Sequence, residues 1–70
     1  MSAAPAELVQ LFHTLNNQLG IILSHAELLE AKAKDERDKA RASLVVTAAV
    51  EALSTARQIR LAVEGGPASR

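Results

Sequence analysis

The chain has 70 residues, eight basic and eight acidic side chains that cancel to a formal net charge of zero, and no cysteine. This length holds one small domain, and so short a chain needs a disulfide, a metal or a partner subunit to be stable. Disulfides are excluded, and two histidines twelve residues apart cannot assemble a structural zinc site of the usual Cys/His kind. We therefore expect stabilisation by oligomerisation, with neither a metal nor a cofactor.

The charge pattern and the hydropathy point to protein partners. The basic residues are scattered and form no stripe, which argues against binding of nucleic acid. No apolar run approaches the roughly 18 residues that span a bilayer, so we expect no membrane insertion. The first residues lack the basic start and the apolar stretch of a signal peptide. A cytoplasmic location is expected.

Most of the chain has the composition of a helix. Fourteen alanines, many leucines and glutamates, and the absence of glycine between Gly20 and Gly65 predict helix almost throughout. Pro5 suits the entry to a helix, and Gly65-Gly66-Pro67 is a stop signal, so the helical region is expected over residues 6–64. Residues 1–5 and 65–70 are expected to be disordered tails.

Apolar residues recur in both halves with the alternating three- and four-residue spacing of a coiled coil. The seam predicted for the first half comprises Leu8, Phe12, Leu15, Leu19, Ile22, Ala26, Leu29 and Ala33. The seam predicted for the second half comprises Ala42, Val45, Ala49, Ala52, Ala56, Ile59 and Val63. The two seams are out of phase by two residues. In a single straight helix they would therefore face different directions, and one of them would be turned away.

This phase break predicts a helical hairpin. Asp35 has the side chain of a helix N-cap, and Asp38, three residues later, can face the amide end of the new helix. We expect a first helix over about residues 6–33, a turn at about 32–37 and a second helix over about 37–64.

The apolar surface of such a hairpin is too wide for one antiparallel contact to cover. Beside the two seams it carries Leu11, Leu23, Val46 and Leu53. The simplest closed solution is an all-α fold in which two antiparallel hairpins form a homodimeric four-helix bundle about a twofold axis. These features alone also suit a purely structural helical dimer.

His13 lies off the predicted seam and is expected to face solvent. The residues three, four, seven and eleven positions later on the same face are small or carry an amide: Asn16, Asn17, Gly20 and Ser24. Glycine inside a helix costs roughly 1 kcal/mol relative to alanine, so Gly20 indicates that another surface approaches closely. His25 lies next to the seam and is interpreted as a partly buried residue at the side of the bundle.

The first helix carries a recognisable pattern: Phe12-His13-Thr14-Leu15-Asn16-Asn17-Gln18-Leu19, then Ile21-Ile22-Leu23-Ser24-His25-Ala26-Glu27-Leu28-Leu29. It resembles the H-box of sensor histidine kinases. In that family the dimerisation and histidine-phosphotransfer domain typically reads His-Glu/Asp-Leu-Asn-Asn-Pro-Leu, then an isoleucine-rich stretch and Ala-Glu-Leu-Leu. Residues 52–59 are similar to a looser motif of the family's second helix. Together the stretches cover about residues 8–62, and the family fold is a dimeric four-helix bundle.

The resemblance implies a histidine phosphotransfer and dimerisation module of a two-component phosphorelay. His13 would be the phosphoacceptor, exchanging phosphoryl groups with an aspartate of a response-regulator receiver domain, and Asn17 would position water. Partner contacts would involve Asn16, Gln18, Gly20 and Ser24. A separate histidine kinase is a further expected partner.

The chain departs from the family pattern in three ways. Thr14 replaces the acid that follows the histidine, and Gln18 stands where proline is frequent. The 70 residues hold no ATP-binding domain, so the chain is phosphotransferase-like at most. Two alternatives stay open: a degenerate kinase-like dimer that binds a receiver or kinase without phosphotransfer, and the excised dimerisation domain of a full histidine kinase.

Overall fold

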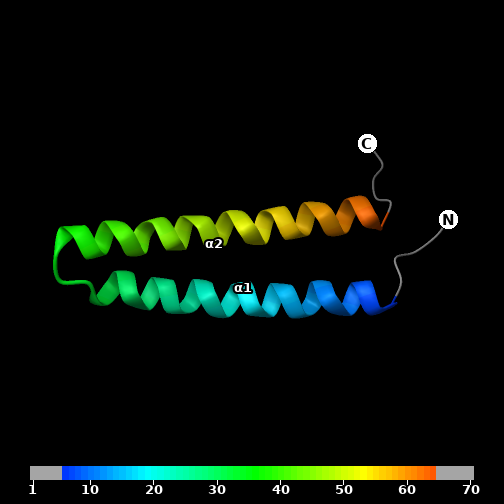
Figure 1. Ribbon diagram of the computed structural model, residues 1–70, viewed down its shortest axis with the longest axis horizontal. Helices are drawn as coiled ribbons and strands as arrows, with labels where there is room; N and C mark the ends of the chain where they lie inside the picture. Colours follow the sequence, from blue (N-terminus) through cyan, green and yellow to red (C-terminus); the bar gives the residue numbers. More distant parts are fainter. Residues whose placement is uncertain (1–5, 65–70) are drawn as a thin grey trace.

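The computed structural model describes residues 6–64, which form two long helices joined by a short turn. Helix α1 spans Ala6–Lys32 and helix α2 spans Glu36–Val63. The two helices run antiparallel and pack against each other along their length (Figure 1). The expected all-helical hairpin is therefore confirmed. Residues 1–5 and 65–70, for which disordered tails are expected, lie outside the described residues.

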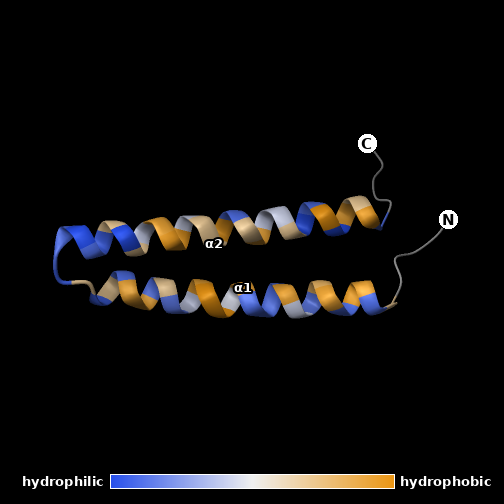
Figure 2. Cartoon of the chain, viewed as in Figure 1, coloured by the Kyte–Doolittle hydropathy of each residue, from blue (hydrophilic) through white to orange (hydrophobic). Residues whose placement is uncertain are grey.

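The turn owes its sharpness to the cap of α2. Asp35 has an extended backbone (φ −120°, ψ 164°), and its Oδ1 accepts a hydrogen bond of 2.8 Å from the backbone N–H of Asp38. The predicted N-cap is confirmed, and the acidic residues Glu36 and Asp38 lie in the first turn, where the helix dipole favours negative charge. Hydrophilic residues gather at the turn and at the start of α2 (Figure 2).

The contact between the helices differs from the predicted seam at every second position. On α1, Phe12, Leu19 and Ala26 face α2 as expected. The positions that complete the contact are half-buried and lie one residue beyond the predicted ones: Val9, Asn16, Leu23 and Glu30. On α2 the same shift puts Val46, Leu53 and Arg60 at the contact. The predicted seams describe the apolar surface of each helix and not one contact, and the structure shows that only part of each seam faces the other helix.

The buried core of the hairpin is small because alanine supplies most of it. Only Phe12, Ala26, Ala42, Ala49 and Ala56 are buried among residues 6–64. The three buried residues of α2 recur every seven positions, so small side chains let the two backbones approach closely along the contact. An alanine core buries little apolar surface, and at roughly 25 cal/mol per Å² it contributes little stability.

The other half of the predicted seam forms an exposed apolar strip along one side of the hairpin. We call it the apolar flank; it comprises Leu15, Ile22 and Leu29 of α1 and Val45, Ala52 and Ile59 of α2. The five large residues of the flank are between 39% and 65% exposed. The shortest extent of the molecule, 11 Å, is close to the diameter of one helix, so within residues 6–64 no second layer covers this strip.

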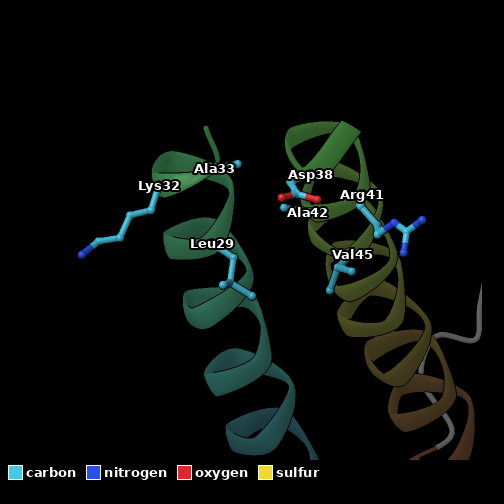
Figure 3. A pocket seen from close by; sticks show the side chains of 7 residues that line it. All are labelled: Leu29, Lys32, Ala33, Asp38, Arg41, Ala42 and Val45. Atoms are coloured by element: carbon cyan, nitrogen blue, oxygen red, sulfur yellow. The ribbon is translucent and has the colours of Figure 1, made fainter. Parts of the chain in front are cut away.

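The two helices contribute to the same flank, as a hollow near the turn demonstrates. Figure 3 shows Leu29 of α1 and Val45 of α2 pointing toward the space between the helices, while Lys32 and Arg41 point outward. The hollow has a volume of about 380 Å³, and its remaining lining residues are Ala33, Asp38 and Ala42. The apolar flank is therefore one continuous surface shared by α1 and α2.

Neither α1 nor α2 is apolar enough along a sufficient length to cross a bilayer.

Candidate functional site

His13 is exposed on α1, on the side opposite the apolar flank. Leu15 follows it by two residues, which places the two side chains about 200° apart around the helix. The expected exposure of His13 is confirmed. Because α1 is continuous through this region, Asn16, Asn17 and Gly20 lie within about 60° of His13 around the helix axis.

The strip of residues beside His13 has short, uncharged side chains. Asn17 and Ser24 are exposed, and Asn16 and Gly20 are half-buried. A methyl group added at Gly20 would meet no atom within 4 Å, so the packing of the hairpin does not require glycine at this position. Glycine at this position lowers helix stability, and nothing in the packing of the hairpin compensates for that loss.

Two sequence-predicted residues lie away from this strip. Gln18 is exposed and lies about 140° around the helix from His13, next to the apolar flank between Leu15 and Ile22. Thr14 is also exposed and projects about 100° from His13. A partner that contacts Asn16 and Gly20 would therefore approach from a different direction than one that contacts Gln18.

Helix α2 adds a set of residues to the His13 side that the sequence patterns did not indicate. Asn16 shares a groove of about 370 Å³ with four residues of α2, which are Leu53, Ser54, Arg57 and Arg60. Arg57 precedes Ile59 of the apolar flank by two residues, so its side chain also points to the opposite side. We call the surface formed by His13, Asn16 and Gly20 of α1 and by Ser54, Arg57 and Arg60 of α2 the histidine flank.

Arg60 is held in this groove without a good partner. Its Nε lies 4.0 Å from Oε2 of Glu64, which is within reach of an ion pair but too long for a hydrogen bond. That Nε is buried and has no hydrogen-bond partner among residues 6–64. A buried N–H donor left unpaired costs free energy, and an acceptor brought to the groove would recover it.

Formal charge is distributed unevenly along the hairpin. Between Glu7 and Glu27, α1 has no aspartate, glutamate, lysine or arginine, and between Glu51 and Glu64, α2 has only Arg57 and Arg60. Over these stretches the only formal charges are those of Arg57 and Arg60, and Glu7, Glu51 and Glu64 border them in the same half of the hairpin. A lack of acidic residues between Glu51 and Glu64 was visible in the sequence, but its position relative to His13 depends on how the helices pair.

The second histidine, His25, is exposed in the single hairpin. Its interpretation as a partly buried residue at the side of the bundle stays a prediction. His25 directly precedes the buried Ala26, and a rotation of about 100° is enough to take it off the contact between the helices. Among residues 6–64, no three histidine or carboxylate side chains come together as metal ligands.

The chain matches no protein-family model, and neither a curated protein nor a solved structure is significantly similar to it. The resemblance to histidine kinases therefore depends on the residues of the sequence alone.

Proposed function

We propose that the protein is a phosphohistidine relay module: a homodimeric four-helix bundle in which His13 exchanges phosphoryl groups with the aspartate of a receiver domain. The observation that carries the proposal is the separation of His13 from the apolar flank. A second hairpin that covers Leu15, Ile22 and Ile59 would leave the histidine flank open to a partner.

Dimerisation is supported by the amount of apolar surface left uncovered. A hairpin with five large exposed residues on one flank and an alanine core lacks the burial that a stable small domain needs. Packing two such flanks about a twofold axis gives a four-helix bundle, with Phe12, Leu19 and Ala26 in its central layers. Each large side chain of the flank would gain about 1–2 kcal/mol from burial of the surface that is now exposed.

The transfer itself needs little more than an accessible imidazole. The ring nitrogen of His13 that carries a lone pair attacks the phosphorus of an aspartyl phosphate and forms an N–P bond. The bond from phosphorus to the acyl oxygen breaks, the carboxylate leaves with the electron pair, and the proton on the other ring nitrogen passes to water. The reverse sequence returns the phosphoryl group to a receiver.

Two features favour relay over autophosphorylation. Thr14 stands where the resembled family has an acid that polarises the histidine during attack on ATP, and a hydroxyl cannot replace a carboxylate in this role. The apolar flank and the exposed His13 fit a relay as well, because a dimer through that flank leaves the imidazole open to a receiver.

The test is formation of phosphohistidine from acyl phosphate donors. The protein is incubated with acetyl phosphate, and separately with a panel of phosphorylated receiver domains, and is analysed by intact mass and by peptide mapping without acid. We expect one added phosphoryl group on His13, none in the His13→Gln variant, and normal labelling in the matched His25→Gln control, since both histidines are exposed.

Two results would overturn the relay. Labelling that persists in His13→Gln would place the acceptor elsewhere. A complete lack of labelling, together with measurable binding of a receiver, would instead favour a degenerate docking dimer, for which the replacement of the family's acid by Thr14 is the specific argument.

A further inference from the structure

We infer that Arg57 and Arg60 of α2 form a binding site for the phosphoryl group that His13 accepts or carries. The inference rests on the proposed function and extends it by naming the residues that hold the anion. The ligand class is a tetrahedral phosphate dianion, whether attached to His13, attached to an acyl donor or free in solution.

The groove places Arg57 and Arg60 on the same flank of the hairpin as Asn16, and His13 lies on that flank by helix geometry. Asn16, one helical turn from His13, lines the groove together with Arg57 and Arg60. Because the helices are antiparallel, Arg57 and Arg60 lie in the half of the hairpin toward the chain ends, which also contains His13 (Figure 1). Packed helices have axes about 8–10 Å apart, so a long arginine side chain on one helix reaches the flank of the other.

The donors of the groove fit a phosphate group. Arginine presents several N–H groups in a planar fork that matches two phosphate oxygens, and hydrogen bonds between charged groups are the stronger ones. Ser54 and Asn16 add a hydroxyl and an amide to the same groove. The buried Nε of Arg60, which has no hydrogen-bond partner among residues 6–64, is a donor that such a ligand could satisfy.

The charge of the surroundings favours an anion here. No acidic residue lies between Glu51 and Glu64 on α2 or between Glu7 and Glu27 on α1. Among residues 6–64 the one carboxylate found within ion-pair distance of these arginines is that of Glu64, beside Arg60. Glu64 lies 4.0 Å from Arg60 Nε and would compete with a phosphate for it. Removal of this carboxylate should therefore strengthen binding of the anion.

During transfer, the arginines would act on the group that moves. Negative charge is spread over the three equatorial oxygens of the phosphoryl group as the P–O bond to the acyl oxygen breaks and the N–P bond to His13 forms. Two positive charges beside these oxygens would stabilise that state and help to keep the phosphoryl group in line with the imidazole.

The first experiment measures binding of inorganic phosphate to the full chain by NMR at constant ionic strength, adjusted with chloride. The observed signals are the side-chain Nε–H resonances of the arginines. We expect saturable shifts for Arg57 and Arg60 and no saturable shift for Arg37, an exposed arginine near the turn. This readout needs no variant, so it stands even if a substitution impairs folding.

Variants then test the contribution of each charge. Arg57→Gln and Arg60→Gln should each weaken phosphate binding about tenfold, the loss expected for one charge-assisted hydrogen bond. Glu64→Gln should tighten it, and the matched control Arg37→Gln should leave it unchanged. The rate at which acetyl phosphate labels His13 should fall in Arg57→Gln and Arg60→Gln, rise in Glu64→Gln and stay unchanged in Arg37→Gln. Circular dichroism checks the helicity of each variant.

The outcomes separate this inference from the relay itself. If His13 is labelled at the same rate in wild type and in the Arg57→Gln/Arg60→Gln double variant, the phosphate site is wrong and the relay stands. If phosphate shifts Arg57 and Arg60 but His13 is never labelled, the site stands and the relay is wrong. If phosphate shifts the resonances of Arg37 and Arg60 equally, the effect is a non-specific response to the anion, and the proposed phosphate site is wrong.

Discussion

The two flanks of the hairpin come from the same two helices but have opposite character. The apolar flank carries Leu15, Ile22 and Ile59 in partly exposed positions, and the histidine flank carries His13, Asn16 and two arginines. Each helix thus turns one face to the other helix and one to the apolar flank, and its remaining surface mixes polar side chains with exposed apolar ones such as Leu28 and Val50. In the proposed dimer the covered apolar flank and the accessible histidine lie about 200° apart on α1.

The largest effect is expected from a charge on the apolar flank. Ile22 is 48% exposed in the hairpin, so Ile22→Asp would be almost neutral if the hairpin were the whole fold. In the proposed bundle the new carboxylate is buried and unpaired, which costs several kcal/mol and should dissociate and unfold the dimer together. Sedimentation and circular dichroism at one protein concentration measure both effects.

A matched control for this prediction is Ser24→Asp, which adds the same charge to an exposed position outside the apolar flank. It should remain a helical dimer. If Ile22→Asp melts like wild type and sediments unchanged, the apolar flank is not an interface. A wild-type monomer at micromolar concentration with full helicity would lead to the same conclusion.

The next effect concerns the alanine contact between the two flanks. Ala49 is only 5% exposed, and Ala49→Leu would force the helices apart, lowering the free energy of unfolding by about 1–3 kcal/mol. Ala48→Leu inserts the same side chain one residue earlier at an exposed position and should change stability little. Denaturant unfolding compares the two, and equal stability would mean that α2 does not face α1 through Ala49.

An acidic residue next to His13 should raise the rate at which this histidine is phosphorylated. Thr14→Glu restores the carboxylate of the resembled family and should raise phosphorylation of His13 at least about tenfold when ATP and a kinase ATP-binding domain are supplied in trans. Thr55→Glu adds the same charge to an exposed threonine of α2 and serves as the control. The rate of phosphohistidine formation is the measurement, and an equal gain in both variants would point to a general charge effect.

The smallest effect is expected at Gly20. Because a methyl group there meets no atom within 4 Å, Gly20→Ala should stabilise the protein by about 0.5–1 kcal/mol. The same change should slow transfer from a receiver if the partner approaches Gly20 closely. Thr47→Ala raises helix propensity at an exposed site of α2 and should leave transfer unchanged. Thermal unfolding and transfer rates are measured together, and normal transfer in Gly20→Ala would show that the close approach does not occur.

Much of the fold could be predicted from local patterns. The alanine-rich composition predicts helix, and the two-residue break in heptad phase predicts the hairpin before any glycine or proline marks a turn. The cap at Asp35 was predictable because its hydrogen bond to Asp38 joins residues three positions apart. The exposure of His13 follows from its place beside Phe12 on a regular helix.

The assignment of neighbours could not be predicted in the same way. Periodicity indicates which residues are apolar on one side of a helix, but it does not say which of them face the second helix. The structure divides the predicted seam of α1, placing Leu19 at the contact and Ile22 on the apolar flank, and it admits Asn16 and Glu30 to the contact.

The sequence by itself determined the helices, the turn, the charge pattern and the accessible histidine, because each depends on residues close together along the chain. Only the tertiary structure decided that Arg57 and Arg60 lie on the histidine flank and that the leucines and isoleucines of the apolar flank share one surface. Both facts depend on how two helices far apart in sequence are rotated and aligned, and the packing of alanine against Phe12, Leu19 and Ala26 fixes that rotation.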